Sequence, residues 1–213
     1  MTRPLDRRLG VLISGRGSNL QSIIEAISQG RLEAEIALVV SNNPDAAGLA
    51  RAARAGIEVM CLRPGAYANR DAYDGAVADA LGARGVDLVC LAGFMRLVGP
   101  ALLEPFPRRV LNIHPSLLPA FPGLDAQRQA LGYGVRVSGA TVHFVTSELD
   151  GGPIVMQAAV PVLADDTVET LSARILSEEH RLYPEAIRLV LDGGWSVIGR
   201  RFVQRVPGRH GDP

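Results

Sequence analysis

The sequence Leu9-Gly10-Val11-Leu12-Ile13-Ser14-Gly15-Arg16-Gly17-Ser18-Asn19 joins an apolar run to a glycine turn, and an amphipathic segment extends from there to about Gln29. The apolar run predicts a strand, and the periodic segment predicts a helix that ends at Gly30. Glycines would let the backbone of the turn approach an anion closely, beside the unpaired N–H groups of a helix start. This strand, turn and helix therefore predict a phosphate site. A Gly-x-Gly pattern alone is also compatible with a simple tight turn.

The details of the turn favour a single phosphate over a dinucleotide or a nucleoside triphosphate. A dinucleotide fingerprint needs a third glycine where this chain has Leu20, and it needs an acidic residue at the end of the second strand. The second expected strand, at 35–40, runs instead into Ser41-Asn42-Asn43-Pro44. A P-loop needs Gly-Lys-Ser/Thr, and this turn contains no lysine.

The rest of the N-terminal part alternates short apolar runs with longer helical patterns. We expect strands at 57–62 and 86–92 and helices at 45–55 and 69–84, with a turn at 63–65. Strands that alternate with helices form parallel sheets with right-handed crossovers. The sequence therefore predicts an α/β fold, a single-domain Rossmann-like, doubly wound, mostly parallel sheet.

The C-terminal part predicts an antiparallel end to this sheet. Residues 136–144 alternate in polarity, a turn cluster follows, and 154–162 resembles a second strand. A short helical turn is expected at 127–131, a long helix from Thr167 to about Leu191, and one last edge strand at 195–203. Without repeats or linkers, we expect one domain over 1–206 and a loose tail over 207–213.

Composition narrows the class of protein. The 213 residues are 47% hydrophobic, and 22 basic residues balance 22 acidic ones, so no net charge draws the chain to nucleic acid or to a membrane. The longest apolar run, 88–95, is too short to span a bilayer, and the first residues do not resemble a signal peptide. Cys61 and Cys90 fall in expected strands without metal-ligand spacing, so we expect buried free thiols and a cytoplasmic location.

A second informative sequence is Leu111-Asn112-Ile113-His114-Pro115-Ser116-Leu117-Leu118-Pro119, which follows the end of an expected strand at 109–111. Side chains alternate along a strand, and Pro115 disfavours a helical His114, so Asn112 and His114 should point the same way. The carboxyl end of a strand is where open α/β sheets bind ligands. An amide donor beside an imidazole suits acyl-type transfer. A structural histidine and a capping asparagine are the alternative interpretation of this sequence.

The apolar loop at 93–100 also has two interpretations. It follows the fourth expected strand and is too apolar for a solvated connection. Either the loop packs against a neighbouring helix, or it forms the wall of a pocket for a flat aromatic ligand.

Four motifs in this order resemble those of the folate-dependent phosphoribosylglycinamide formyltransferases of purine biosynthesis, and the likeness runs from about Gly10 to Trp195. The motifs are Ser14-Gly15-x-Gly17-Ser18-Asn19-Leu20, Leu91-Ala92-Gly93-Phe94-Met95-Arg96, Asn112 to Pro119, and Thr141-Val142-His143-Phe144-Val145-Thr146-x-Glu148-Leu149-Asp150-Gly151-Gly152-Pro153. The Asn-x-His and Leu-Asp-Gly-Gly elements are shared with methionyl-tRNA formyltransferase and formyltetrahydrofolate hydrolase. The glycine turn and the compact length favour the first family.

The resemblance implies that a formyltransferase domain at 1–206 moves the formyl group of 10-formyltetrahydrofolate, a cosubstrate, to the amine of glycinamide ribonucleotide. It implies a catalytic trio of Asn112, His114 and Asp150, in which the carboxylate favours the imidazolium form of His114. For the ribonucleotide it implies a phosphate cradle with Arg16 beside it and a ribose contact from the long helix: Gly17, Ser18, Asn19, Leu20, Gln21 and Glu179. For the folate it implies Arg70, Met95, Arg96, Leu97, Val98, Asn112, Thr146, Ser147, Glu148, Leu149 and Asp150.

Further expectations come from the same resemblance. The amine attacks directly, so we expect no metal and no covalent nucleophile, and we expect small-molecule partners only, with no nucleic acid and no membrane, for a monomer or homodimer. The chain departs from the family pattern at Arg16, Ala120, Asp125 and Gln127, which concern local contacts near the phosphate and the folate.

Three other functions are compatible with parts of this sequence pattern. A formyltetrahydrofolate hydrolase would use water as the acceptor and carry an N-terminal regulatory domain, whereas about eight residues precede the first expected strand here. A transferase acting on tRNA would carry a basic C-terminal domain. A non-catalytic Rossmann-like module would bind a nucleotide without turnover.

Overall fold

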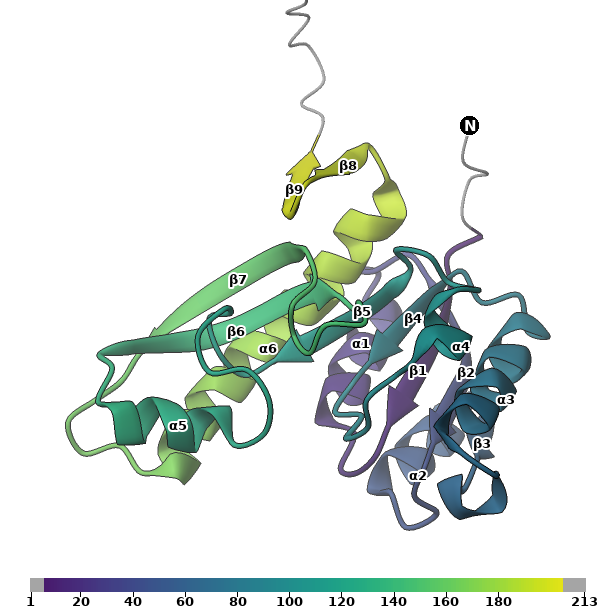
Figure 1. Cartoon of the computed structure of the whole chain (residues 1–213), viewed down its shortest axis with the longest axis horizontal. Helices are drawn as coiled ribbons and strands as arrows, with labels where there is room; N and C mark the ends of the chain where they lie inside the picture. Colours follow the sequence, from purple (N-terminus) through teal and green to yellow (C-terminus); the bar gives the residue numbers. More distant parts are fainter. Residues whose placement is uncertain (1–5, 205–213) are drawn as a thin grey trace, which may run out of the picture.

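The computed structural model describes residues 6–204, which form a sheet in the strand order β3-β2-β1-β4-β5-β6-β7-β9-β8 (Figure 1). The strands pair in parallel from β3 to β5, and β5, β6 and β7 pair antiparallel. The parallel strands are β1 (Arg8–Ile13), β2 (Glu35–Ser41), β3 (Val59–Cys61), β4 (Leu88–Leu91) and β5 (Val110–His114). The remaining strands are β6 (Val137–Phe144), β7 (Ile154–Pro161), β8 (Trp195–Ile198) and β9 (Arg201–Gln204). The predicted mostly parallel α/β sheet with an antiparallel C-terminal part is confirmed.

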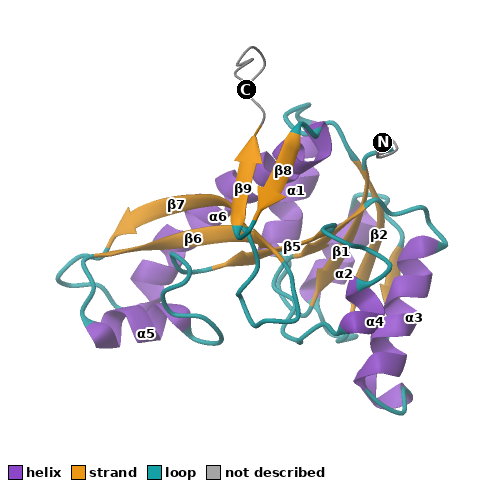
Figure 2. Ribbon diagram, turned by 45° about the horizontal axis from the view of Figure 1, so that its top comes forward, coloured by secondary structure: helices purple, strands orange, loops and turns teal. Residues whose placement is uncertain are grey.

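Helices cover both faces of the sheet because its central strands are apolar on both sides. Along β1, Leu9, Val11 and Ile13 pack into one hydrophobic cluster and Leu12 packs into the other. The first cluster is covered by α1 (Ser18–Ser28), α2 (Ala47–Arg54), α5 (Ala126–Tyr133) and α6 (Val168–Asp192). The second is covered by α3 (Arg70–Gly82) and α4 (Pro100–Leu103). This is the doubly wound arrangement, and Figure 2 shows β6, β7 and α5 extending to one side of it.

The long helix α6 contacts two central strands of the sheet, β4 and β5. Thr167 caps the helix through a reciprocal capping box with Thr170, at the start of the helix that the sequence predicts. Further along, the buried Tyr183 hydroxyl lies 3.0 Å from the carbonyl oxygen of Leu91 and 3.1 Å from that of Leu111. One O–H can donate to one of these acceptors at a time. Tyr183 therefore fixes α6 against the end of β4 and against β5 at the residue before Asn112.

Several expectations about individual elements were wrong. The single edge strand expected at 195–203 is a hairpin, because Gly199 adopts φ +61° and reverses the chain between β8 and β9. The short helix α4 was not expected. Where a turn was expected at 63–65, the chain forms the 3-10 helix η1 (Pro64–Ala66). The helical turn expected at 127–131 is the longer α5, which ends at the left-handed Gly134. The proposed tail at 207–213 lies outside the described residues.

The two cysteines differ in burial. Cys90 lies in a central strand, where burial raises the pKa of its thiol to about 12. Cys61 is exposed, contrary to expectation, because β3 is the short edge strand of the sheet. Within residues 6–204, no helix is long and apolar enough to cross a membrane.

Candidate active site

Strand β5 brings Asn112 and His114 to one face, as the alternation predicts, and the neighbouring strand β6 adds His143, which was not among the predicted site residues. In the antiparallel pairing of β5 with β6, His143 lies directly opposite Asn112. Opposed side chains on one face of an antiparallel pair are neighbours. The imidazole Nε2 of His143 lies 3.2 Å from the amide Nδ2 of Asn112.

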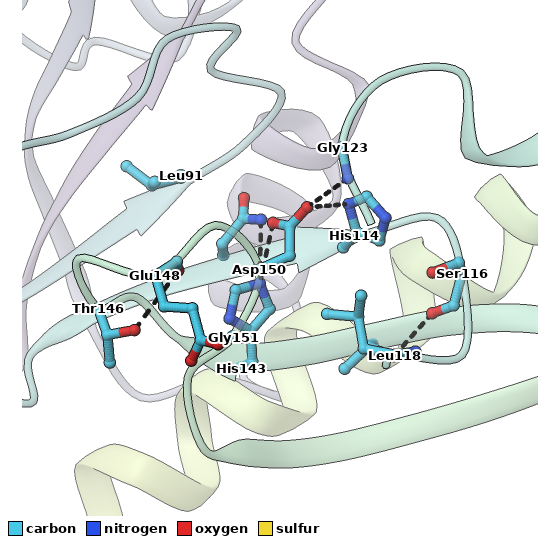
Figure 3. Close-up of polar contacts among 12 residues, drawn as sticks. Leu91, His114, Ser116, Leu118, Gly123, His143, Thr146, Glu148, Asp150 and Gly151 are labelled. Carbon is cyan, nitrogen blue, oxygen red and sulfur yellow. Dashed lines mark hydrogen bonds and ion pairs between the residues drawn. The ribbon is translucent and has the colours of Figure 1, made fainter. Parts of the chain in front are cut away.

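Asp150 reaches this face from the loop between β6 and β7 (Figure 3). Its Oδ2 lies 3.4 Å from Nδ1 of His114, and its Oδ1 lies 3.6 Å from Nε2 of His143. The backbone N–H of Gly123 donates to Oδ2 at 2.8 Å. Three separate segments therefore converge on one carboxylate, whose side chain is 10% exposed.

The loop that carries Asp150 adopts an unusual backbone. Asp150 has φ +48°, a left-handed conformation that aspartate and asparagine tolerate better than other non-glycine residues. Two residues later, a Cβ on Gly152 would lie 1.8 Å from the carbonyl oxygen of Phe144. Gly152 therefore permits the close approach that turns the carboxylate toward the histidines.

The hydrogen bonds of His143 define its protonation. Its Nδ1 lies 2.9 Å from the carbonyl oxygen of Phe144, which can only accept, so Nδ1 carries the proton. Burial lowers the pKa of His143, while the Phe144 carbonyl and the Asp150 charge oppose that change and His114 adds to it. The neutral ring then leaves Nε2 free to accept an N–H of Asn112, which fixes the orientation of that amide.

His114 is held by a second set of contacts. Its Nε2 lies 2.9 Å from the carbonyl oxygen of Phe121 and therefore donates to it, while Nδ1 faces Asp150. The residue is 5% exposed. Each ring nitrogen of this buried imidazole therefore faces an oxygen atom that can accept a hydrogen bond.

The glycine turn precedes a helix start without a cap. Gly17 has φ +70° at the N-cap of α1, no side chain caps the helix, and its first turn contains no acidic residue. The first N–H groups of the helix are thus available to an anion. A Cβ on Gly17 would also lie 2.7 Å from Cα of Gly48 in α2, so packing requires this glycine independently of any ligand.

The side chains of the first turn of α1 lie in different places. Leu20 is fully buried in the core, so only its backbone can contact a ligand. Asn19 donates through Nδ2 to Oε2 of Glu179 at 2.8 Å, while its Oδ1 has no hydrogen-bond partner among the described residues. Burial raises the pKa of Glu179, and the hydrogen bond from Asn19 opposes this. The glycine turn and the long helix, predicted to share one ligand, are therefore in contact.

The apolar loop at 93–100 combines both interpretations of its sequence. Phe94 packs into the second cluster, whereas Met95 and Leu97 are 67% and 59% exposed. The Arg96 guanidinium lies 4.9 Å from the centre of the Tyr73 ring, on α3. Its side chain therefore contacts α3 rather than the trio.

On the opposite loop, Glu148 pairs with Arg200 of the β8–β9 hairpin at 3.1 Å. Arg200 also donates to the carbonyl oxygen of Gly151. A cavity of about 540 Å³ lies between α4, this loop and the hairpin, and its lining includes Thr146, Ser147 and Glu148. Its lining residues do not include the trio. Among residues 6–204, no cluster of His, Cys, Asp and Glu side chains could hold a metal ion.

Comparison with known proteins identifies the class. The family described as Formyl transferase matches residues 7–187, so the chain belongs to the formyl transferase family and is an enzyme. The chain is 48% identical to phosphoribosylglycinamide formyltransferase from Escherichia coli K12 over 183 residues, which are 86% of each protein.

Two further relatives agree. The chain is 46% identical to the human trifunctional purine biosynthetic protein adenosine-3 over 186 residues. The aligned part is 87% of this chain and 18% of that protein. The crystal structure of glycinamide ribonucleotide transformylase 1 from Symbiobacterium toebii matches with a TM-score of 0.92 and 58% identity over 94% of each chain. The names of these relatives favour neither the hydrolase nor the non-catalytic module.

Proposed function

We propose that this formyl transferase moves the formyl group of 10-formyltetrahydrofolate to the amine of glycinamide ribonucleotide in purine biosynthesis. The observation that carries the proposal is the meeting of Asn112, His114 and Asp150 at the carboxyl end of β5, with Asp150 Oδ2 3.4 Å from His114 Nδ1. Relatives named for this reaction support the choice of substrate.

Formyl transfer requires the site to stabilise a developing negative charge and to allow proton transfer. As the substrate amine attacks the formyl carbon, the carbonyl electrons move to oxygen. The resulting oxyanion accepts a hydrogen bond from the second N–H of Asn112, and the charge of the His114 imidazolium stabilises it. Asp150 stabilises that imidazolium by its charge. When the intermediate collapses, the bond to the folate nitrogen breaks, that nitrogen gains a proton, and the attacking amine loses one.

An assay with both substrates tests the proposal. We expect consumption of 10-formyltetrahydrofolate to require glycinamide ribonucleotide and to yield the formylated ribonucleotide. Formate release that is independent of the ribonucleotide would indicate the hydrolase. Binding of the ribonucleotide without turnover would indicate a non-catalytic module.

We also propose that the phosphate of the ribonucleotide binds the first turn of α1, and Ser18→Asp tests this. A negative charge at a helix start stabilises the helix but repels a phosphate bound there. We expect the KM for the ribonucleotide to rise by about tenfold or more while thermal stability is kept or increased.

Ser18→Asn is the matched neutral control for this change, and it should leave that KM close to the wild-type value. An unchanged KM in Ser18→Asp would place the phosphate elsewhere.

His143 is proposed as a positioning residue for the amide of Asn112. His143→Leu removes the acceptor at 3.2 Å from Asn112 Nδ2, so the amide is free to rotate, and we expect kcat to fall by about tenfold. Because a glutamine can still offer an acceptor oxygen, His143→Gln should recover part of the loss. Equal kcat values for both variants and wild type would remove His143 from the site.

A further inference from the structure

The segment at 93–99 contains the residues 95–98 that are predicted for the folate, and it is anchored at both ends. At its start, the N–H of Ser14 donates to the Gly93 carbonyl oxygen at 3.1 Å, and the N–H of Met95 donates to Ser14 Oγ at 2.8 Å. At its end, the N–H of Gly99 donates to Oδ2 of Asp74 at 2.6 Å. Hydrogen bonds to Ser14 and to Asp74 therefore fix the two ends of the segment, on either side of its exposed residues.

Asp74 is a buried carboxylate that the reaction itself does not use. It lies in α3 and is 1% exposed. Burial raises its pKa, while the Gly99 N–H and the charges of Arg70 and Arg96 act in the opposite direction. A carboxylate that is charged when buried costs folding stability. This one lies near two arginines of the predicted folate set, Arg70 and Arg96, and Arg70 also pairs with Asp71 at 3.9 Å.

The fit around Gly99 shows how closely the two elements approach. Gly99 has φ −107°, which any residue can adopt, so conformation does not require a glycine here. A Cβ would lie 3.1 Å from Asp74 Oδ2 and 3.3 Å from Arg70 Nε. The glycine thus leaves room for the carboxylate and for the Arg70 side chain.

The residue before Asp74 holds the middle of the same segment. Tyr73 is buried, and its ring carries the Arg96 guanidinium at 4.9 Å from the ring centre. Consecutive residues of α3 therefore contact the segment at two points, Tyr73 through a ring face and Asp74 through a hydrogen bond.

We infer that Asp74 is a positioning residue for the formyl-donor site, which fixes the end of the 95–98 segment through Gly99 and orients Arg70 and Arg96 by its charge. This inference rests on the proposed function. It differs from a purely structural role because an uncharged side chain would fill the same space without the cost of a buried charge.

Steady-state kinetics on Asp74→Ala and Asp74→Asn test the inference. Asp74→Ala removes both the acceptor and the charge, so we expect the KM for 10-formyltetrahydrofolate to rise by about tenfold. Asp74→Asn keeps an acceptor oxygen and removes only the charge, so we expect a rise of about threefold. In both variants kcat and the KM for the ribonucleotide should stay near wild type. Asp79→Ala, at an exposed position of the same helix, is the control.

Folate affinity, measured by titration calorimetry, gives a second readout. The ligand is 5-formyltetrahydrofolate, a formylated folate that cannot serve as this donor. If the alanine variant does not fold, Asp74→Asn alone is measured. A loss of folate affinity in a variant that melts like wild type supports the inference. Unchanged folate KM and affinity in both variants, or equal losses for both substrates, overturn it and leave the proposed function standing. A wild-type protein that neither turns over nor binds the folate overturns the proposed function itself.

Discussion

Asn112→Ala should lower kcat by about 10²–10³-fold while the KM for the folate changes little, because the amide is asked to contact charge that develops in the transition state. The geometry sharpens this expectation. His143 accepts one N–H of the amide at 3.2 Å, and its own tautomer is fixed by the Phe144 carbonyl, so the second N–H has a defined direction before any ligand binds. An oriented donor stabilises an oxyanion without reorganisation during the reaction.

The measurement is kcat and KM for both substrates, with a thermal melt of each protein. Asn112 lies in a strand between β4 and β6, so the melt separates a damaged sheet from a lost donor. A higher folate KM at unchanged kcat would make Asn112 a ligand-binding residue and would leave the oxyanion without its proposed donor.

The fold was predictable where short-range pattern and long-range packing agree. The four consecutive apolar residues of β4 are buried on both faces, as a parallel strand requires. Thr167 and Thr170 are adjacent enough in sequence for their capping box to be anticipated. Such features depend on neighbours within one element.

Elements whose state depends on distant contacts were not predictable. Val59–Cys61 has the composition of a buried strand, but its place at the edge of the sheet leaves Cys61 exposed, and strand order is a property of the whole chain. The hairpin at Gly199 was missed because the turn interrupts a continuous β-like pattern with a single glycine.

In the candidate site, too, local features were predictable and long-range contacts were not. The shared face of Asn112 and His114 follows from the two-residue period of a strand. His143 joins them only through the antiparallel register that sets it opposite Asn112, and no local pattern specifies that register. The sequence offered two signals for His143, its polar position in the alternation of β6 and its place in the fourth motif. Asp74 gave no signal, because its partner Gly99 lies 25 residues away.

Asp150 also lies far from His114 in sequence, and the resemblance alone associated the two. Their contact at 3.4 Å makes Asp150→Asn the most direct test of how the site uses charge. Asparagine keeps the shape of aspartate, tolerates the left-handed backbone at φ +48°, and retains an oxygen to accept the Gly123 N–H. The loop should therefore keep its conformation while the imidazolium of His114 loses its counter-charge.

We expect kcat of Asp150→Asn at neutral pH to fall by about 10²-fold or more, since proton transfer and oxyanion stabilisation by His114 both depend on its protonated form. The kcat profile against pH should change as well, because Asp150 is the negative charge that faces both histidines. The pKa of His143, already lowered by burial, should fall further, since the Asp150 charge is among the influences that raise it.

A matched control is available in Asp125→Asn. Asp125 is an exposed aspartate with φ +55°, two residues after Gly123, and its side chain makes no capping hydrogen bond to α5. The same substitution in the same backbone conformation should therefore leave kcat and its pH profile at wild-type values. NMR titration of both histidine rings, alongside the kinetics, identifies which ring responds. If Asp150→Asn lowered the melting temperature but kept the wild-type pH profile, Asp150 would only hold the turn, and the counter-charge role would be wrong.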